Sequence, residues 1–190
     1  MSAVSADLTD IDLTVHDRRI AARHAGRDTA ELEIPILSAT GSGPTTLAAF
    51  DSALLSAGIA NFNLVRLSSV IPPGTTILDD GARTDGGSRG NWGDRLYCVY
   101  ARQDATEPGS EAWAGISWVQ DPDSGAGLFV EHEGSSEIAV RADLKASINA
   151  LCRNRGISGL AAHSRVVGAV SRTEPVCAMV IAPYVTAGWS

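Results

Sequence analysis

The order of β-like and helical stretches constrains the fold of this chain more than any other feature of its sequence. Only two helices are predicted, over about residues 47–57 and 136–154, and they lie far apart in the sequence. Apolar stretches bounded by glycine and proline predict a larger number of strands, over residues 32–39, 63–67, 95–101, 112–119, 127–133, 159–170 and 175–185. We therefore expect an α+β domain in which helices cover sheet layers.

The chain length of 190 residues allows one domain, or at most two. Residues 1–30 are polar and mixed in charge and show no strand period, so we predict a mobile or helical N-terminal extension outside the core. Residues 31–190 are then expected to form the domain. Residues 79–93 are rich in glycine and predict a loop that could act as a mobile lid.

Charge and cysteine content narrow the expected partners and location. With 15 basic and 22 acidic residues the formal net charge is −7, so nucleic acids and anionic membranes would repel the chain, and we expect neither as a partner. The three cysteines, at positions 98, 152 and 177, are too few and too scattered for a disulfide framework or a zinc site. We expect reduced thiols, no bound metal and a cytoplasmic protein.

Lysine is almost absent from the chain. Lys145 is the only one among the 15 basic residues, and it follows Leu144 in a predicted helix with no glycine-rich loop beside it. An enzyme that needs a lysine Schiff base or a phosphate-loop lysine would have to use this residue. Pyridoxal-phosphate chemistry and a P-loop are therefore poor explanations of this sequence.

Asp51 breaks the pattern of the first predicted helix. At 100° per residue, Leu47, Phe50 and Leu54 form one stripe, and Asp51 falls inside it. A carboxylate on an apolar face is costly unless it meets a cation. Two readings stay open, a structural pair with an internal arginine such as Arg66, or a ligand-binding role.

Glu131 breaks the pattern of a predicted strand. The alternation over residues 128–133 places Phe129, Glu131 and Glu133 on one face. A carboxyl beside Phe129 would be desolvated, which raises its pKa and makes it a proton donor near neutral pH. The plainer alternative is a strand end entering solvent. A metal site is disfavoured, because His132 points to the opposite face from both glutamates.

Two adjacent serines, Ser68 and Ser69, follow a predicted strand and precede an extended proline pair. A serine pair alone carries almost no information, but its context does. The segments AFDSALLSAGI (49–59) and NLVRLSSVIPP (63–73) resemble the pyruvoyl-dependent arginine decarboxylase family, and GLFVEHEG (127–134) continues the match. A weaker match to the family lies at residues 176–180. In all, the resemblance covers roughly residues 34–184 with the order of elements kept.

The resemblance implies self-cleavage between Ser68 and Ser69, giving a β chain of residues 1–68 and an α chain of residues 69–190. The Ser69 hydroxyl attacks the Ser68 carbonyl to give an ester, and β-elimination then frees Ser68 as a carboxylate. Tautomerisation and hydrolysis of the resulting dehydroalanine leave a covalently bound pyruvoyl group at position 69. A strained peptide between the strand and the prolines would favour the attack.

The family match also implies roles in catalysis. The substrate amine forms a Schiff base with the pyruvoyl ketone, CO2 leaves, and Glu131 reprotonates the α-carbon. Asn63 matches an asparagine near the pyruvoyl group, and Asp51 matches the acidic residue that faces the guanidinium of arginine.

As an implication of the family, we expect a four-layer αββα sandwich that assembles as a trimer, or a multiple of it, with active sites between subunits. The expected activity is the decarboxylation of L-arginine, a small-molecule substrate, to agmatine and CO2. Two alternatives remain. The scaffold could decarboxylate a different amino acid, or the chain could be a non-catalytic homologue or regulatory partner that keeps the fold without cleaving.

Overall fold

The computed structural model describes residues 32–79 and 90–189. The expected N-terminal extension over residues 1–30, and most of the glycine-rich loop, lie outside these described residues. The elements are β1 (Leu32–Pro35), β2 (Leu37–Ser42), α1 (Thr46–Ser56), β3 (Asn63–Arg66), β4 (Val70–Ile71), β5 (Thr75–Leu78), β6 (Arg95–Ala105), β7 (Glu111–Gln120), β8 (Gly127–Gly134), α2 (Glu137–Arg155), β9 (Ala162–Val170) and β10 (Val176–Ala187). The predicted α+β class, with strands predominating, is confirmed.

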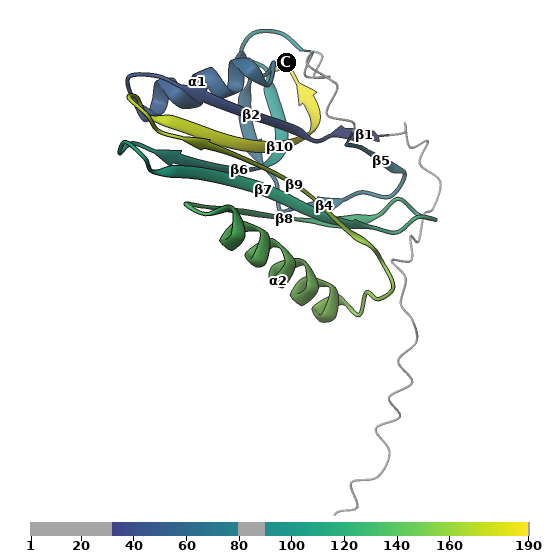
Figure 1. The fold of residues 1–190 in the computed structure, drawn as a ribbon. Coiled ribbons are helices and arrows are strands. Elements are labelled where there is room, and N and C mark those ends of the chain that lie inside the picture. Colours follow the sequence, from purple (N-terminus) through teal and green to yellow (C-terminus); the bar gives the residue numbers. More distant parts are fainter. Residues whose placement is uncertain (1–31, 80–89, 190) are drawn as a thin grey trace, which may run out of the picture.

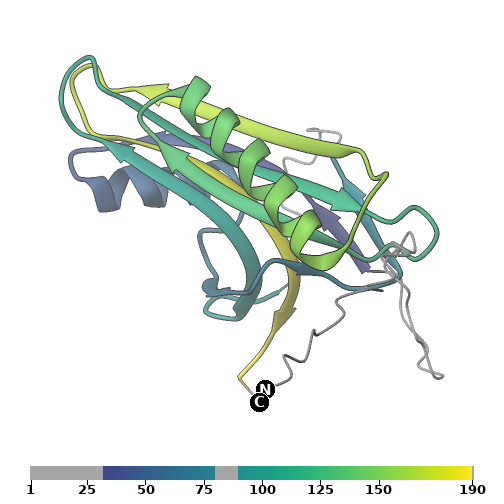
Figure 2. The same ribbon diagram turned by 90° about the horizontal axis from the view of Figure 1, so that it is seen from below.

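Two four-stranded sheets form the body of the molecule. The first sheet has the strand order β2-β10-β6-β3, and the second has the order β4-β8-β7-β9. Helix α1 packs on the first sheet and α2 packs on the second, so that α1, the two sheets and α2 follow one another in Figure 1. Seen from below in Figure 2, α2 runs diagonally across the outer face of its sheet.

Strand β10 contributes side chains to two hydrophobic cores, one between α1 and the first sheet and one between the two sheets. Its residues Cys177, Met179 and Ile181 face α1, whereas Val176, Ala178, Val180 and Ala182 pack between the two sheets. This alternation follows from the two-residue period of a strand. Because both faces of β10 are covered, its sequence is a continuous apolar run rather than an alternating one.

The ends of both helices follow from the sequence. The Thr45 side chain caps α1 by accepting a hydrogen bond from the Ala48 N–H, and Ser136 caps α2 in the same way at Ala139. Gly156 ends α2 with a left-handed backbone, which glycine adopts without a steric penalty. A Cβ on Gly41 of β2 would collide with the Ala49 carbonyl and the Ala53 nitrogen, so the close approach of α1 to its sheet requires glycine at this position.

Two details of the strand prediction are wrong. The first predicted strand is interrupted at Ile36, because β1 pairs with β5 whereas β2 pairs with β10. Strand β5 itself was not predicted, since its partner β1 lies over 40 positions earlier in the chain. No helix within residues 32–79 or 90–189 is long and apolar enough to cross a membrane.

The chain passes from one sheet to the other between β3 and β4. Strand β3 is an edge of the first sheet, where it pairs in parallel with β6. Strand β4 is an edge of the second sheet, where it pairs with β8. Only Leu67, Ser68 and Ser69 connect them. The serine pair singled out in the sequence is therefore the crossover between the two sheets.

Candidate active site

The crossover at Ser68 and Ser69 lies beside an open sheet edge. Strand β4 is only two residues long and pairs with Leu128 and Gly127, so β8 has no β4 partner beyond Phe129. Ser69 has φ 65°, and it is the only residue other than glycine with positive φ among those described. A left-handed backbone is unfavourable for serine and is held here by the pairing on both sides.

The Ser69 hydroxyl points at the carboxylate of Glu131. It lies 2.8 Å from Oε1 and 2.9 Å from Oε2, so the hydroxyl donates to a carboxylate that holds it with both oxygens. The two residues are 62 positions apart in the sequence, and they meet because β4 lies next to β8. A serine hydroxyl bound to a carboxylate is a nucleophile with its proton acceptor already in place.

Glu131 is desolvated, as its position beside Phe129 predicts. Its side chain is only 10% exposed, and Phe129 is fully buried. Burial raises the pKa of Glu131, while the hydrogen bond from Ser69 and the Arg66 guanidinium, 4.0 Å away, oppose that rise. The alternative of a strand end entering solvent is therefore wrong for this residue.

The neighbours of Glu131 do not form a metal site. His132 points to the other face of β8, where its Nε2 lies 2.7 Å from the Ser147 hydroxyl on α2. Nowhere in the described part of the chain do three His, Cys, Asp or Glu side chains gather closely enough to hold a metal ion.

An open groove runs along this edge of the second sheet. It has a volume of about 440 Å³ and is lined by Ser68, Ser69, Phe129, Val130, Glu131, His132, Ser147, Ala150 and Leu151. The crossover and β8 supply one wall, and α2 supplies the other. The groove thus gives small molecules access to both the serine pair and the buried carboxylate.

Two hydrogen bonds fix the backbone on the C-terminal side of the serine pair. The N–H of Phe129 donates to the Ser69 carbonyl over 2.9 Å, and the Tyr184 hydroxyl donates to the Val70 carbonyl over 3.0 Å. Burial, and to a lesser extent the nearby Glu131 charge, raise the pKa of Tyr184, so its hydroxyl remains a donor at neutral pH. Sequence reasoning missed Tyr184, because only the packing of β10 against the second sheet brings it here.

Asn63 lies at the start of β3, at the opposite end of that strand from the crossover. It is exposed, and its side-chain amide donates to the Gly93 carbonyl over 2.6 Å. The Trp189 indole donates to the same carbonyl over 2.8 Å. Asn63 is not among the residues that line the Ser69 groove.

Asp51 is exposed on the outer face of α1, so the prediction that it lies in a buried apolar stripe is wrong within this chain. The buried face consists of Ala49, Ala53 and Leu54, because small side chains let α1 approach the sheet closely. Leu47 and Leu55, one turn before and after Asp51, are 71% and 63% exposed. Arg66 is not its partner, since the Arg66 guanidinium lies near Glu131 instead.

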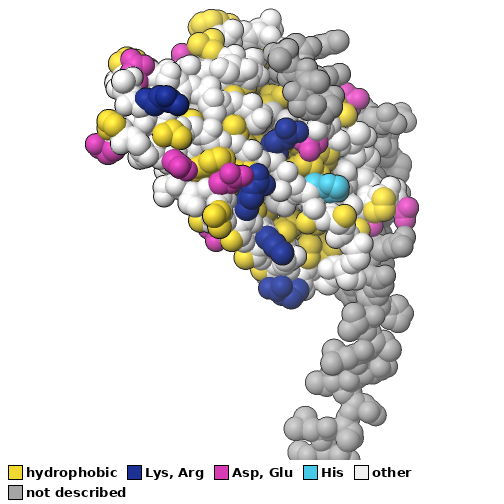
Figure 3. Space-filling view, viewed as in Figure 1, with side chains coloured by type: hydrophobic (Ala, Val, Ile, Leu, Met, Phe, Trp, Pro, Cys, Tyr) yellow, Lys and Arg dark blue, Asp and Glu magenta, His cyan; other side chains and the backbone are white. Residues whose placement is uncertain are grey.

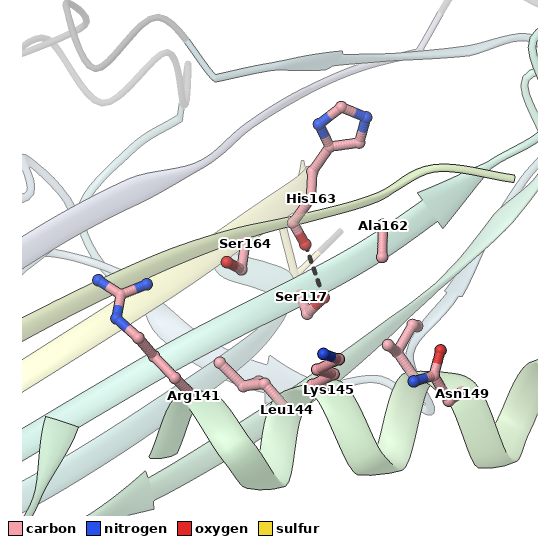
Figure 4. Close-up of a pocket in the computed structure, with 9 residues that line it drawn as sticks. Ser117, Arg141, Leu144, Lys145, Asn149, Ala162, His163 and Ser164 are labelled. Carbon is pink, nitrogen blue, oxygen red and sulfur yellow. Dashed lines mark hydrogen bonds between the residues drawn. The ribbon is translucent and has the colours of Figure 1, made fainter. Parts of the chain in front are cut away.

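A second cavity, of about 330 Å³, lies on the β9 side of α2. In Figure 4, Arg141, Lys145 and Asn149 reach it from successive turns of α2, and Ser117 and Ser164 border it from the strands. The His163 ring points away from it and stacks on Trp118, while the His163 carbonyl accepts a hydrogen bond from Ser117. Figure 3 shows basic side chains in a line across β9 and α2 on this face.

The only lysine of the chain, Lys145, lines this second cavity. The cavity shares no residue with the Ser69 groove. Within one chain, Lys145 therefore lines a different cavity from the serine pair.

The family model and the curated relatives agree on one family. The family model described as pyruvoyl-dependent arginine decarboxylase matches residues 33–186. The pyruvoyl-dependent arginine decarboxylase of Halobacterium salinarum is 42% identical over 99 residues, which are 52% of this chain and 58% of that protein. The Pyrococcus abyssi protein of the same name is 39% identical over 99 residues, which are 52% of this chain and 60% of that protein.

The aligned part of this chain thus spans about three fifths of the length of these curated relatives. Among solved structures, a pyruvoyl-dependent histidine decarboxylase at pH 8 covers 75% of this chain and 63% of its own, with 14% identity and a TM-score of 0.38.

Proposed function

Because the chain belongs to the pyruvoyl-dependent arginine decarboxylase family, we propose that it is a self-processed decarboxylase that converts L-arginine to agmatine and CO2. The observation that carries this proposal is the Ser69 hydroxyl held against the Glu131 carboxylate at a strained crossover. In the same proposal the α1–sheet–sheet–α2 arrangement is the family's four-layer αββα sandwich. Residues 31–190 form its domain, and cleavage divides the chain into residues 1–68 and 69–190.

The described residues fit a covalently bound pyruvoyl group at position 69. Ser69 supplies the carbon atoms, and the Phe129 N–H already binds the carbonyl that would adjoin the new ketone. The groove leaves about 440 Å³ beside Ser69 for a substrate. When present, the group supplies a ketone that takes up the substrate amine and an electron sink for the loss of CO2.

Glu131 is the proton acceptor in the proposed cleavage. It takes the proton of the Ser69 hydroxyl as the oxygen forms a bond to the Ser68 carbonyl carbon. The C–N bond between Ser68 and Ser69 then breaks, and the proton passes to the departing Ser69 nitrogen, so an ester replaces the amide. The left-handed backbone at Ser69 favours the reaction, because the strain is released when the peptide bond is cut.

Glu131 would serve again during turnover as the proton donor. A carboxyl with a pKa raised by burial holds its proton closer to neutral pH than an exposed one. It lines the groove next to position 69, where the substrate α-carbon must be protonated after CO2 leaves.

The two product chains are expected to remain one molecule. Each strand before the crossover pairs with a strand after it, namely β1 with β5, β2 with β10 and β3 with β6. In addition, α1 packs on β2 and β10 together. Breaking the Ser68–Ser69 bond therefore removes no strand pair.

Asp51 would contact substrate from a neighbouring subunit. Its carboxylate is exposed between two exposed leucines on α1, which is a face suited to burial in an oligomer. We propose a trimer, or a multiple of it, in which Asp51 of one chain binds the substrate guanidinium near Ser69 of the next. Asn63 is proposed to act at the same interface, in cleavage or in orienting the substrate.

One preparation tests the proposed function. Denaturing electrophoresis and mass spectrometry of the purified protein should show residues 1–68 and 69–190 as separate peptides, and Ser69→Ala should leave the chain whole. The release of CO2 should be measured with arginine, lysine, ornithine and histidine. An intact chain with full decarboxylase activity would refute the proposal, and release from another amino acid alone would refute the assignment of arginine.

A further inference from the structure

Arg66 differs from the other arginines that pair with a carboxylate in the described residues. Arg102, Arg141 and Arg165 each hydrogen-bond an acidic side chain at 2.6–2.7 Å. The Nη2 atom of Arg66 instead lies 4.0 Å from Oε2 of Glu131, beyond hydrogen-bond reach. Arg66 is 54% exposed, whereas Glu131 is 10% exposed.

The position of the Arg66 guanidinium is fixed by an aromatic ring rather than by the carboxylate. Its central carbon lies 5.1 Å from the centroid of the Tyr100 ring, within cation–π range. Arg66 is the last residue of β3, where it pairs with Cys98 of β6, and Tyr100 is two residues further along β6 on the same face. The guanidinium therefore lies at the β3 edge of the first sheet, 4.0 Å from the carboxylate of Glu131 in the second.

At Glu131 the hydrogen bond and the positive charge come from different residues, Ser69 and Arg66. Both carboxylate oxygens remain bound to the Ser69 hydroxyl, while Arg66 supplies a positive charge from 4.0 Å. We propose that Arg66 keeps Glu131 ionised in the uncut chain and thereby sets the pH above which self-cleavage proceeds. The inference rests on the proposed self-cleavage and gives Arg66 a positioning role, exerted through Glu131.

None of the other described groups that act on Glu131 carries a permanent positive charge. Tyr184 of β10 and the buried Cys98 of β6 both have raised pKa values, to about 12 for Cys98, so both are neutral at pH 7. On β8, Glu133 opposes ionisation of Glu131, whereas a charge on His132, which lies on the α2 face, favours it less than Arg66 does. Ile116 of β7, opposite Glu131, is apolar, and Ser69 carries no charge. Among the described groups that act on Glu131, Arg66 is thus the only permanent cation.

The pH dependence of cleavage should reveal this role. Full-length chains are synthesised in a cell-free reaction, transferred to buffers from pH 5 to 9, and sampled into denaturant for electrophoresis. Cleavage needs ionised Glu131, so its rate should fall on the acidic side of the Glu131 pKa. Arg66→Met removes the charge, so the fall in cleavage rate at acidic pH (the acidic limb of the pH curve) should move to higher pH. The shift should be about one pH unit, since Arg66 is partly screened by water. On that limb the rate at a given pH then falls about tenfold.

Two further variants separate charge from packing. Arg66→Lys restores a cation and should return the limb most of the way to the wild-type position. Arg102→Met is the matched control, because Arg102 lies 3.9 Å from the centroid of the Phe50 ring and pairs with Asp104 rather than Glu131. It should leave the limb unchanged. A loss of rate that is the same at every pH in Arg66→Met would overturn the inference and indicate a packing role.

A direct titration covers the case in which the Arg66 variant shows no measurable cleavage at any pH, so that no pH curve can be drawn. In full-length Ser69→Ala, with ¹³C-labelled glutamate, the Glu131 carboxyl can be titrated by NMR with and without Arg66→Met. An upward shift supports the inference, and an unchanged midpoint refutes it. If the wild-type chain itself never cleaves, the proposed function fails; if it cleaves and Arg66→Met follows the same pH curve, only the role of Arg66 fails.

Discussion

The left-handed backbone of Ser69 predicts an unusual order of stability for two variants that cannot cleave. Ser69→Ala and Ser69→Gly both lose the hydroxyl and its hydrogen bond to Glu131, so they differ only in the Cβ. At φ 65° a Cβ is unfavourable by roughly 1–2 kcal/mol, whereas glycine adopts this conformation freely. Glycine is also more flexible when unfolded, which costs about 0.5–1 kcal/mol. We therefore expect Ser69→Gly to be the more stable variant, by up to about 1 kcal/mol.

Thermal and urea unfolding at equal protein concentration can measure this difference. In a domain of this size, 1 kcal/mol corresponds to a Tm difference of about 2–4 °C. Position 68 is the matched control, because Ser68 is not among the residues with positive φ. In the Ser69→Ala background, Ser68→Gly should be less stable than Ser68→Ala. If glycine is the less stable residue at position 69 as well, the crossover holds no backbone strain, and strain cannot assist cleavage.

Three other outcomes follow from the site. Glu131→Gln should slow cleavage on electrophoresis and lower CO2 release from the cleaved fraction by about 10²–10⁴-fold, because it can neither accept nor supply the proton. In the wild type, raising the pH through the elevated Glu131 pKa should accelerate cleavage, which needs the ionised form, and depress turnover, which needs the protonated form; a parallel response of both rates would contradict the shared role. Asp51→Asn should reduce kcat/KM for arginine by roughly tenfold to a hundredfold while leaving the Tm of the isolated chain nearly unchanged, since Asp51 is exposed; a lower Tm with unchanged kcat/KM would show a structural role instead.

Local rules predicted the parts of the fold that depend on neighbouring residues. Both helices begin after a capping residue that the sequence offers, Thr45 or Ser136, and α2 ends at Gly156. The desolvation of Glu131 could also be predicted, because strand alternation alone places it beside Phe129. These features need no knowledge of which strand pairs with which.

Features that depend on how closely elements approach could not be predicted in this way. The sequence pattern predicts Asp51 on the buried face of α1, because the large apolar residues Leu47, Phe50 and Leu54 lie on the same side of the helix. The helix instead buries its alanines against Gly41, which turns Leu47 and Leu55 outward. The pattern likewise suggests Arg66 only as a partner of Asp51, whereas the sheet-to-sheet crossover brings Arg66 to Glu131.

The serine pair lies on the crossover between the two sheets. This position explains how its backbone can be strained and why the proposed cut there would disrupt neither sheet. A peptide within a strand has its hydrogen bonds in a ladder, and cutting it would release part of a sheet. The Ser68–Ser69 peptide lies outside both ladders, between the last residue of β3 and the first of β4. The flanking strands are anchored independently, β3 by β6 and β4 by β8, with Tyr184 holding Val70 from the first sheet. The sheets can therefore impose an unfavourable backbone on Ser69, and they would keep their pairing after the proposed cut.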